Sequence, residues 1–132
     1  MLRGNLTESV MADAEPTQGR IEVSDEDAKL VTLARSSRVR TGAVEGAAVR
    51  DETGRTYAAT TVALSSLNLT AIQAAVAAAV ASGAKALEGA AVSTQVDAIG
   101  DDDLAVLREL AVAGAVVVRA GVDGQVQEIV AL

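Results

Sequence analysis

The sequence predicts an α/β protein: a three-layer α/β/α sandwich around a five-stranded mixed sheet, with the element order αββαβαββ. Helix start and stop signals alternate with short apolar runs throughout residues 24–132. Strands separated by helices predict crossovers packed on the faces of one sheet. Two short glycine-containing turns predict antiparallel hairpins, one early and one late in the domain. A chain of 132 residues suits one domain with a single core.

Three segments carry the signals of a helix. Ser24 is followed by three acidic residues, which together cap and complement the amino end of a helix that we expect to run to about residue 36. The stretch SSLNLTAIQAAVAAAVASG, residues 65–83, predicts a second helix, and residues 100–114 predict a third. The second helix is expected to present one apolar stripe to the core, formed by Leu69, Ile72, Val76 and Val80.

The remaining apolar runs predict five strands. Residues 44–50 and 55–63 flank the turn DETG and are expected to form a hairpin. Residues 86–94 are a short apolar run suited to a buried strand. Residues 115–120 and 125–132 flank the turn GVDG, which predicts a closing hairpin.

The amino-terminal segment has a different composition from the rest. Residues 1–23 are polar, include the single proline, and predict a disordered tail ahead of the domain at residues 24–132. They lack the apolar run of a signal peptide, so a cytoplasmic location is expected. Residues 65–83 carry no charge, but their apolar part is too short and too alanine-rich to span a bilayer, and no membrane association is expected.

Composition narrows the chemistry. The chain has no Cys and no His, which removes disulfides and the usual ligands of tight zinc, iron–sulfur and copper sites. A net charge of -7 argues against direct nucleic-acid binding, because phosphate neutralisation needs clustered Lys and Arg. Arg35, Arg38 and Arg40 are read as the solvated end of the first helix. The acidic run 101–103 is read as a helix cap rather than a magnesium site.

Several short segments resemble the cytidine deaminase family. TGAVEGAAV at 41–49 is similar to that family's Ser-Gly-Phe-x-Val-Gly-Ala-Ala segment. TGRTYAATTVA at 53–63 is similar to Asp-Gly-Arg-x-Phe-x-Gly-Cys-Asn-Val-Glu, and VLREL at 106–110 to Val-Leu-Arg-Glu-Phe. With the order of elements, the resemblance covers residues 24–132 and implies the fold of a cytidine deaminase. Because the chain has no Cys and no His, the resemblance implies a degenerate, zinc-less family member of the actinobacterial type.

The resemblance also locates the family's zinc chemistry. In that family a Cys-Ala-Glu at the start of the second helix supplies one ligand and the proton-shuttling Glu, and a Pro-Cys-x-x-Cys before the third helix supplies two more ligands. The first motif falls either on residues 70–72 or on residues 66–68, and the second places Gly100 and Asp103 at the ligand positions. No Cys, His or Glu stands at any of these positions in either register.

The substrate-binding positions differ as well. The Asn and Glu that hold the ribose in the family match Thr61 and Ala63, and the Phe beside the pocket matches Ala43. We define the remnant pocket as the residues expected around this site, which are Thr61, Ala63, Ser65, Ser66, Asn68, Thr70, Ile72 and Asp103.

These substitutions predict that the chain is not an enzyme, with no catalytic residue, no metal and no cofactor. The favoured function is an oligomeric interaction or regulatory module, a dimer or tetramer, with a further protein partner that the sequence does not identify. The alternative is a metal-free protein or enzyme that binds a nucleoside-like or nucleotide-like ligand in a repurposed pocket. Polar groups for this purpose are offered by Thr61, Ser65, Ser66 and Asn68.

Overall fold

The computed structural model describes residues 21–132 and confirms the predicted fold class. The predicted tail, residues 1–23, lies outside the described residues except for its last three. The elements in chain order are α1 (Asp25–Thr41), β2 (Gly46–Asp51), β3 (Thr56–Thr60), β4 (Val62–Ala63), β5 (Asn68–Leu69), α2 (Ala71–Ala81), β6 (Leu87–Ser93), α3 (Asp101–Leu110), β7 (Val116–Ala120) and β8 (Val126–Ala131).

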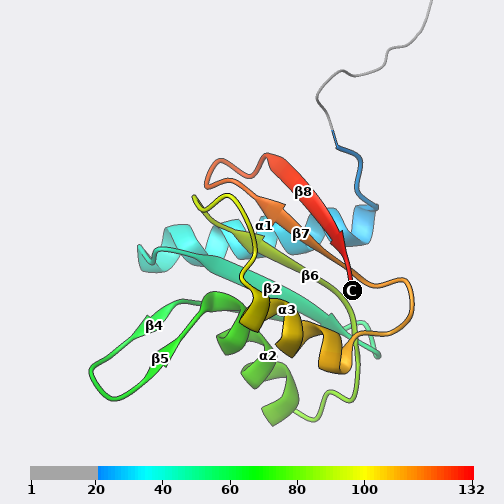
Figure 1. The fold of residues 1–132 in the computed structure, drawn as a ribbon, viewed down its shortest axis with the longest axis horizontal. Helices are drawn as coiled ribbons and strands as arrows, with labels where there is room; N and C mark the ends of the chain where they lie inside the picture. Colours follow the sequence, from blue (N-terminus) through cyan, green and yellow to red (C-terminus); the bar gives the residue numbers. More distant parts are fainter. Residues whose placement is uncertain (1–20) are drawn as a thin grey trace, which may run out of the picture.

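One sheet organises the molecule. Its strand order is β3-β2-β6-β7-β8, in which the β6–β7 pair is parallel and the other pairs are antiparallel. α1 packs on one face of this sheet, and α2 and α3 pack on the other, which gives the three layers (Figure 1). Within β2, Ala47 and Val49 belong to the core under α2, and Ala48 belongs to the core under α1, as the alternation of side chains along a strand requires.

α1 is longer than the sequence predicted. Its start is as expected, because the Asp27 backbone N–H donates to the Ser24 hydroxyl at 3.1 Å. The helix continues past residue 36 to Thr41 and ends at Gly42, whose φ of 69° is left-handed. No residue before Gly42 breaks the helix, so the glycine sets its end.

Small side chains bring α1 very close to the sheet. A Cβ added to Gly46 would lie 2.1 Å from the Ala34 carbonyl oxygen, so only glycine fits at this point of β2. Ala48 and Ala91 continue the contact on neighbouring strands and are fully buried. Small side chains at this contact therefore let the backbones of α1 and the sheet pack closely, without large apolar side chains between them.

The second helix is shorter than predicted, because its expected first turn forms a second hairpin instead. Val62 pairs with Leu69 in the two-stranded β4–β5 unit, which projects away from the main sheet (Figure 1). α2 begins at Ala71, because the side chains and backbone N–H groups of Thr70 and Gln73 cap each other reciprocally. The predicted apolar stripe is also wrong at two positions, since Leu69 lies in β5 ahead of the helix and Val80 is 49% exposed. The buried face consists of Ala71, Ile72, Ala75, Val76 and Ala79.

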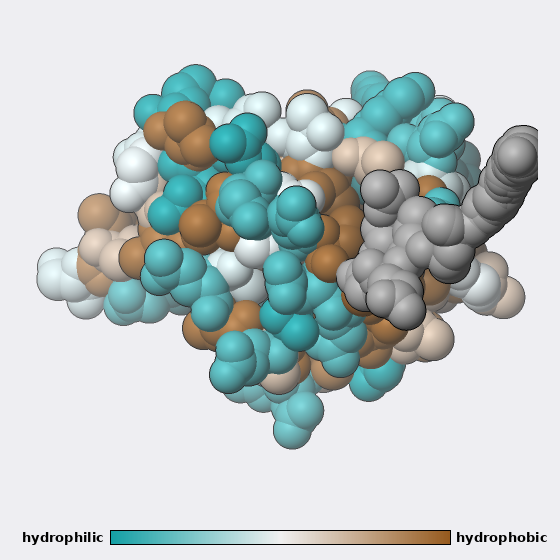
Figure 2. All heavy atoms as spheres, turned by 90° about the horizontal axis from the view of Figure 1, so that it is seen from above, coloured by the Kyte–Doolittle hydropathy of each residue, from teal (hydrophilic) through white to brown (hydrophobic). Residues whose placement is uncertain are grey.

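The surface mixes polar and apolar side chains. Seen toward the β8 edge, hydrophobic residues form separate patches among hydrophilic ones (Figure 2). Among residues 21–132, no helix combines the length and the hydropathy needed to cross a membrane.

Candidate functional site

The amino ends of α2 and α3 meet through one hydrogen bond. The Thr70 hydroxyl, at the cap of α2, donates to Asp103 Oδ1 in the first turn of α3 at 2.7 Å. The same hydroxyl oxygen accepts from the Gln73 backbone N–H at 3.0 Å. Thr70 therefore caps one helix and ties it to the other with a single side chain.

A small cavity of about 40 Å³ lies beside this contact. We call it the inner cavity, and it is lined by Glu45, Ile72, Val92, Thr94, Val96, Ala98, Ile99, Gly100 and Asp103. Glu45 accepts a hydrogen bond from the hydroxyl of Thr94, which is almost fully buried. Two carboxylates, one before β2 and one in α3, thus border a cavity with room for little more than a water molecule or one polar group.

A larger, open hollow of about 320 Å³ is also lined by Glu45. We call it the outer hollow, and it is lined by Val44, Glu45, Thr61, Val62, Ala63, Asn68, Leu69, Thr70 and Gln73. The β4–β5 hairpin forms one of its walls. The lining is mainly apolar with a few polar groups, which is the usual make-up of small-ligand sites.

The structure distributes the remnant pocket over these two spaces. Thr61, Ala63, Asn68 and Thr70 line the outer hollow. Ile72 and Asp103 line the inner cavity. Ser65 and Ser66 line neither and are exposed at the turn of the β4–β5 hairpin. α2 begins at Ala71, within residues 70–72, whereas residues 66–68 lie in the β4–β5 hairpin ahead of the helix.

Sequence reasoning missed Glu45, which borders both the inner cavity and the outer hollow. Its backbone N–H donates to the Thr61 hydroxyl at 3.2 Å, which fixes it against the end of β3. The available signal was an acidic residue at a position where the similar family segment has Val. The residues that contact Glu45 are Thr61 and Thr94, which are distant from it in the sequence. The acidic residue by itself therefore did not indicate a pocket.

The family's zinc does not fit this site. The matching positions offer the hydroxyl of Thr70, the carboxylate of Asp103 and no side chain at Gly100, whereas such zinc sites need three nitrogen or sulfur ligands. Within the part of the chain that the structure describes, no group of three or more His, Cys, Asp or Glu residues could hold a metal ion.

With this geometry in place, comparison with known proteins identifies the family. The profile described as "Cytidine deaminase-like" matches residues 23–124. The chain belongs to the cytidine deaminase-like family. No curated protein matches the sequence.

Three solved cytidine deaminases share the fold of this family member. The enzyme from Burkholderia pseudomallei is 21% identical over 78% of this chain and 90% of its own, with a TM-score of 0.64. The Mycobacterium leprae enzyme is 17% identical over 75% and 89%, with a TM-score of 0.58. A mutant of the Mycobacterium tuberculosis enzyme is 23% identical over 65% and 82%, with a TM-score of 0.53.

The family match corrects the expectation that this chain is not an enzyme. The domain is cytidine deaminase-like and the solved structures that share its fold are cytidine deaminases, which point toward an enzyme. The missing Cys and His residues remove the family's zinc ligands. They do not show inactivity, because carboxylates and hydroxyls can also hold substrates and move protons.

Proposed function

We propose that this cytidine deaminase-like protein binds a small, neutral, nucleoside-like ligand in the outer hollow, without zinc. The observation that carries the proposal is the position of Glu45, whose carboxylate borders the outer hollow and the inner cavity. In the family a Glu and an Asn hold the ribose, and their matching positions here are Ala63 and Thr61. Glu45 supplies a carboxylate to the same hollow from a different element, next to Thr61.

The chemistry of the hollow favours this ligand class. Its apolar wall, which includes Val62 and Leu69, suits the faces of a sugar and a base. A carboxylate accepts hydrogen bonds from sugar hydroxyls, and the amide of Gln73 adds a second polar group at the wall. A phosphate group is disfavoured here, because Glu45 borders the outer hollow, Asp103 borders the inner cavity next to it, and the chain carries a net charge of -7.

The proposal is tested with nucleosides and their 5′-monophosphates in thermal-shift and calorimetric titrations. We expect at least one nucleoside to bind saturably and its monophosphate to bind more weakly. The variant Glu45→Gln, which removes the charge at constant size, is expected to weaken nucleoside binding at least about tenfold, the loss of one charge-assisted hydrogen bond.

The matched control is Glu109→Gln, which makes the same change on an exposed residue of α3 outside both spaces. Binding that is equally weakened in both variants, or no binding of any nucleoside at millimolar concentration, would overturn the proposal. Mass spectrometry of the same incubations measures turnover. Conversion of a nucleoside that Glu45→Gln abolishes would extend the proposal from binding to catalysis.

A second candidate function, homo-oligomeric assembly, is favoured by the β4–β5 hairpin. Leu64 and Leu67 at its turn are 59% and 48% exposed, and nearby Val44 is 71% exposed. Large apolar side chains on a projecting hairpin are suited to packing against a second copy. We propose a dimer or tetramer assembled through this hairpin.

Light scattering coupled to size exclusion tests the assembly. A dimer or tetramer is expected at micromolar concentration for the parent chain, and a smaller species for the variant with Leu64→Ser and Leu67→Ser. Val112→Ser is the control, because Val112 is also exposed but lies after α3, away from the hairpin. A monomeric parent chain would contradict the proposal.

A further inference from the structure

Two threonines hold Glu45, one at its backbone and one at its side chain. The Glu45 N–H donates to the Thr61 hydroxyl at 3.2 Å, and the Thr61 N–H donates to the Glu45 carbonyl at 3.2 Å. These contacts fix the main chain just before β2 but do not reach the carboxylate. Among the described residues, the one hydrogen-bond donor to the Glu45 carboxylate is the Thr94 hydroxyl, which binds Oε2. The direction of the carboxylate therefore depends on Thr94.

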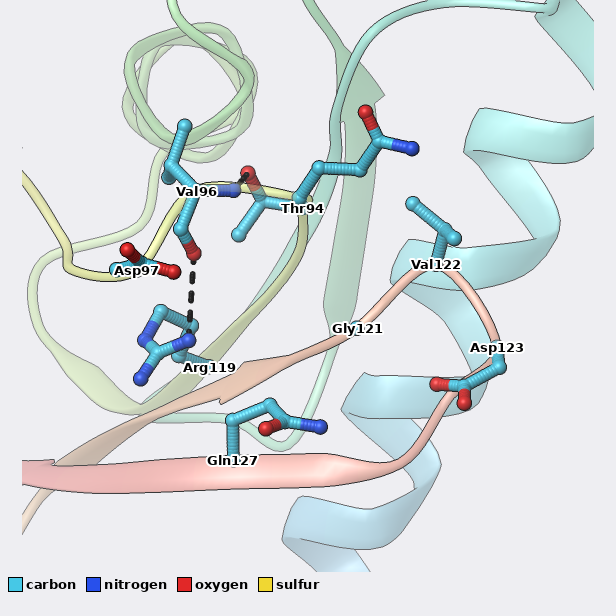
Figure 3. Close-up of a pocket in the computed structure, with 9 residues that line it drawn as sticks. Thr94, Val96, Asp97, Arg119, Gly121, Val122, Asp123 and Gln127 are labelled. Atoms are coloured by element: carbon cyan, nitrogen blue, oxygen red, sulfur yellow. Dashed lines mark hydrogen bonds between the residues drawn. The ribbon is translucent and has the colours of Figure 1, made fainter.

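The Thr94 hydroxyl has a fixed direction of its own. Its oxygen accepts a hydrogen bond from the Val96 backbone N–H at 3.1 Å, and Figure 3 shows the two groups side by side. Because the oxygen accepts from Val96, the hydroxyl hydrogen is free to point at Glu45. Thr94 is 3% exposed, so bulk water does not compete for this hydrogen bond. Thr94 thus presents a donor to Glu45 in a defined orientation.

The segment that carries Thr94 and Val96 is braced by the sheet. Thr94 directly follows β6, and its N–H donates to the Ala120 carbonyl at 2.9 Å, at the end of the parallel β6–β7 pair. Arg119 Nη1 donates to the Val96 carbonyl at 3.2 Å (Figure 3), and its Nε donates to Glu128 Oε1 at 3.0 Å. The Arg119 side chain is only 14% exposed. The position of the Thr94 hydroxyl is therefore set by the central strands.

Thr94 and Glu45 lie differently with respect to the two spaces. Thr94 lines the inner cavity and is not part of the lining of the outer hollow. Glu45 lines both. An effect of Thr94 on a ligand in the outer hollow therefore has to pass through Glu45.

We infer that Thr94 is a positioning residue for ligand binding in the outer hollow. It binds Oε2 of Glu45 from the side of the inner cavity and leaves Oε1 to accept from the ligand. A glutamate side chain that is already held in place loses less conformational freedom when a ligand binds, so the affinity is higher. This inference rests on the proposed function, because it concerns the same carboxylate and the same hollow.

Calorimetric titration of threonine variants with the best-binding nucleoside tests the inference. Thr94→Val removes the hydroxyl at nearly constant size and is expected to weaken binding at least about fivefold. Thr94→Ser keeps the hydroxyl and is expected to stay within about twofold of the parent affinity. The matched control is Thr32→Val on the exposed face of α1, outside both spaces, which is expected to leave the affinity unchanged.

A double-mutant cycle separates positioning from a general structural effect. In a Glu45→Ala background no carboxylate remains to be oriented, so adding Thr94→Val is expected to change the residual affinity by less than about twofold. Circular dichroism verifies that every variant is folded at the temperature of the titration. An equal loss of affinity from Thr94→Val with and without the Glu45 side chain would overturn the inference.

Crystal structures without ligand give a readout that does not depend on nucleoside binding. The Glu45 carboxylate is expected to keep its position in Thr94→Ser and to leave it in Thr94→Val. An unmoved carboxylate in Thr94→Val would overturn the positioning role, whether or not a nucleoside binds. A parent chain that binds no nucleoside would instead contradict the proposed function, so the two failures are distinguishable.

Discussion

The β2–β3 turn and the inner cavity beside the amino ends of α2 and α3 both hold carboxylates, but the hydrogen bonding of these carboxylates differs. At the turn, Asp51 is 1% exposed. Its Oδ1 accepts from the backbone N–H and hydroxyl of Thr53 at 2.8 and 2.6 Å and from the Arg55 N–H at 3.1 Å. Its Oδ2 accepts from the Tyr57 hydroxyl at 2.7 Å. Each oxygen of Asp51 is therefore occupied within the chain.

Beside the inner cavity, each of the two carboxylates accepts one side-chain hydrogen bond. Glu45 accepts from the Thr94 hydroxyl and Asp103 from the Thr70 hydroxyl. Both border the inner cavity, and the remaining lone pairs are free for water or a ligand. The comparison teaches that a carboxylate saturated by its own chain supports the fold, whereas one that is partly satisfied beside a cavity is available for binding.

The largest loss of stability is expected from replacing Asp51, because both of its carboxylate oxygens accept hydrogen bonds within the chain. Asp51→Ala leaves two backbone N–H groups and two hydroxyls without their acceptor and is expected to lower Tm by about 10 °C or more. Calorimetry or circular dichroism measures the shift. The control Asp102→Ala removes an exposed carboxylate and is expected to change Tm little. A similarly small change in Tm for both variants would contradict the prediction that Asp51 stabilises the β2–β3 turn.

Lowering the pH is expected to destabilise the folded protein through protonation of Asp51. The Thr53 side-chain hydrogen bond, followed by that of Tyr57, lowers the pKa of Asp51 from an ordinary value of 3.8 to about 2. Because the folded state binds this proton more weakly, the contribution of Asp51 is complete above about pH 4 and is lost as the pH falls toward 2. Denaturation curves between pH 2 and 6 are expected to show this loss. The curves of Asp51→Asn are expected to be flatter over the same range.

An intermediate effect is expected at Thr70, where one hydroxyl joins the two helices. Thr70→Val removes both the cap of α2 and the bond to Asp103 and is expected to cost about 1 to 2 kcal/mol in the free energy of unfolding. Thr70→Ser keeps the hydroxyl and is expected to cost less than about 0.5 kcal/mol. Urea denaturation measures both variants. An equal loss for both would contradict the prediction, because Thr70→Val lacks the hydroxyl that Thr70→Ser keeps.

The smallest stability effect is expected at Glu45. Glu45→Gln keeps an acceptor for the Thr94 hydroxyl, so the free energy of unfolding is expected to stay within about 0.5 kcal/mol of the parent value. The same variant is expected to weaken nucleoside binding at least about tenfold, so the effects on stability and on ligand binding separate at this residue. A large destabilisation without any change in binding would show that Glu45, like Asp51, supports the fold and does not bind a ligand.

The order and type of the main elements follow from local sequence signals. Ser24 with its acidic neighbours starts α1, glycine-containing turns separate the paired strands, and the family resemblance is carried by short segments that a sequence displays directly. The β4–β5 hairpin was missed because Leu67, Leu69 and Ile72 give an apolar run that suits a helix as well as a strand. The capping by Thr70, which only the folded backbone reveals, decides between them.

The sequence by itself determined the fold class, the family and the lack of the family's zinc ligands, because these depend on residue types and their order. Only the tertiary structure decided which side chains share a cavity. Glu45 meets Thr94, and Thr70 meets Asp103, across 49 and 33 residues of chain. Such contacts depend on how the helices and strands pack, and periodicity within one element cannot report on its neighbours in space.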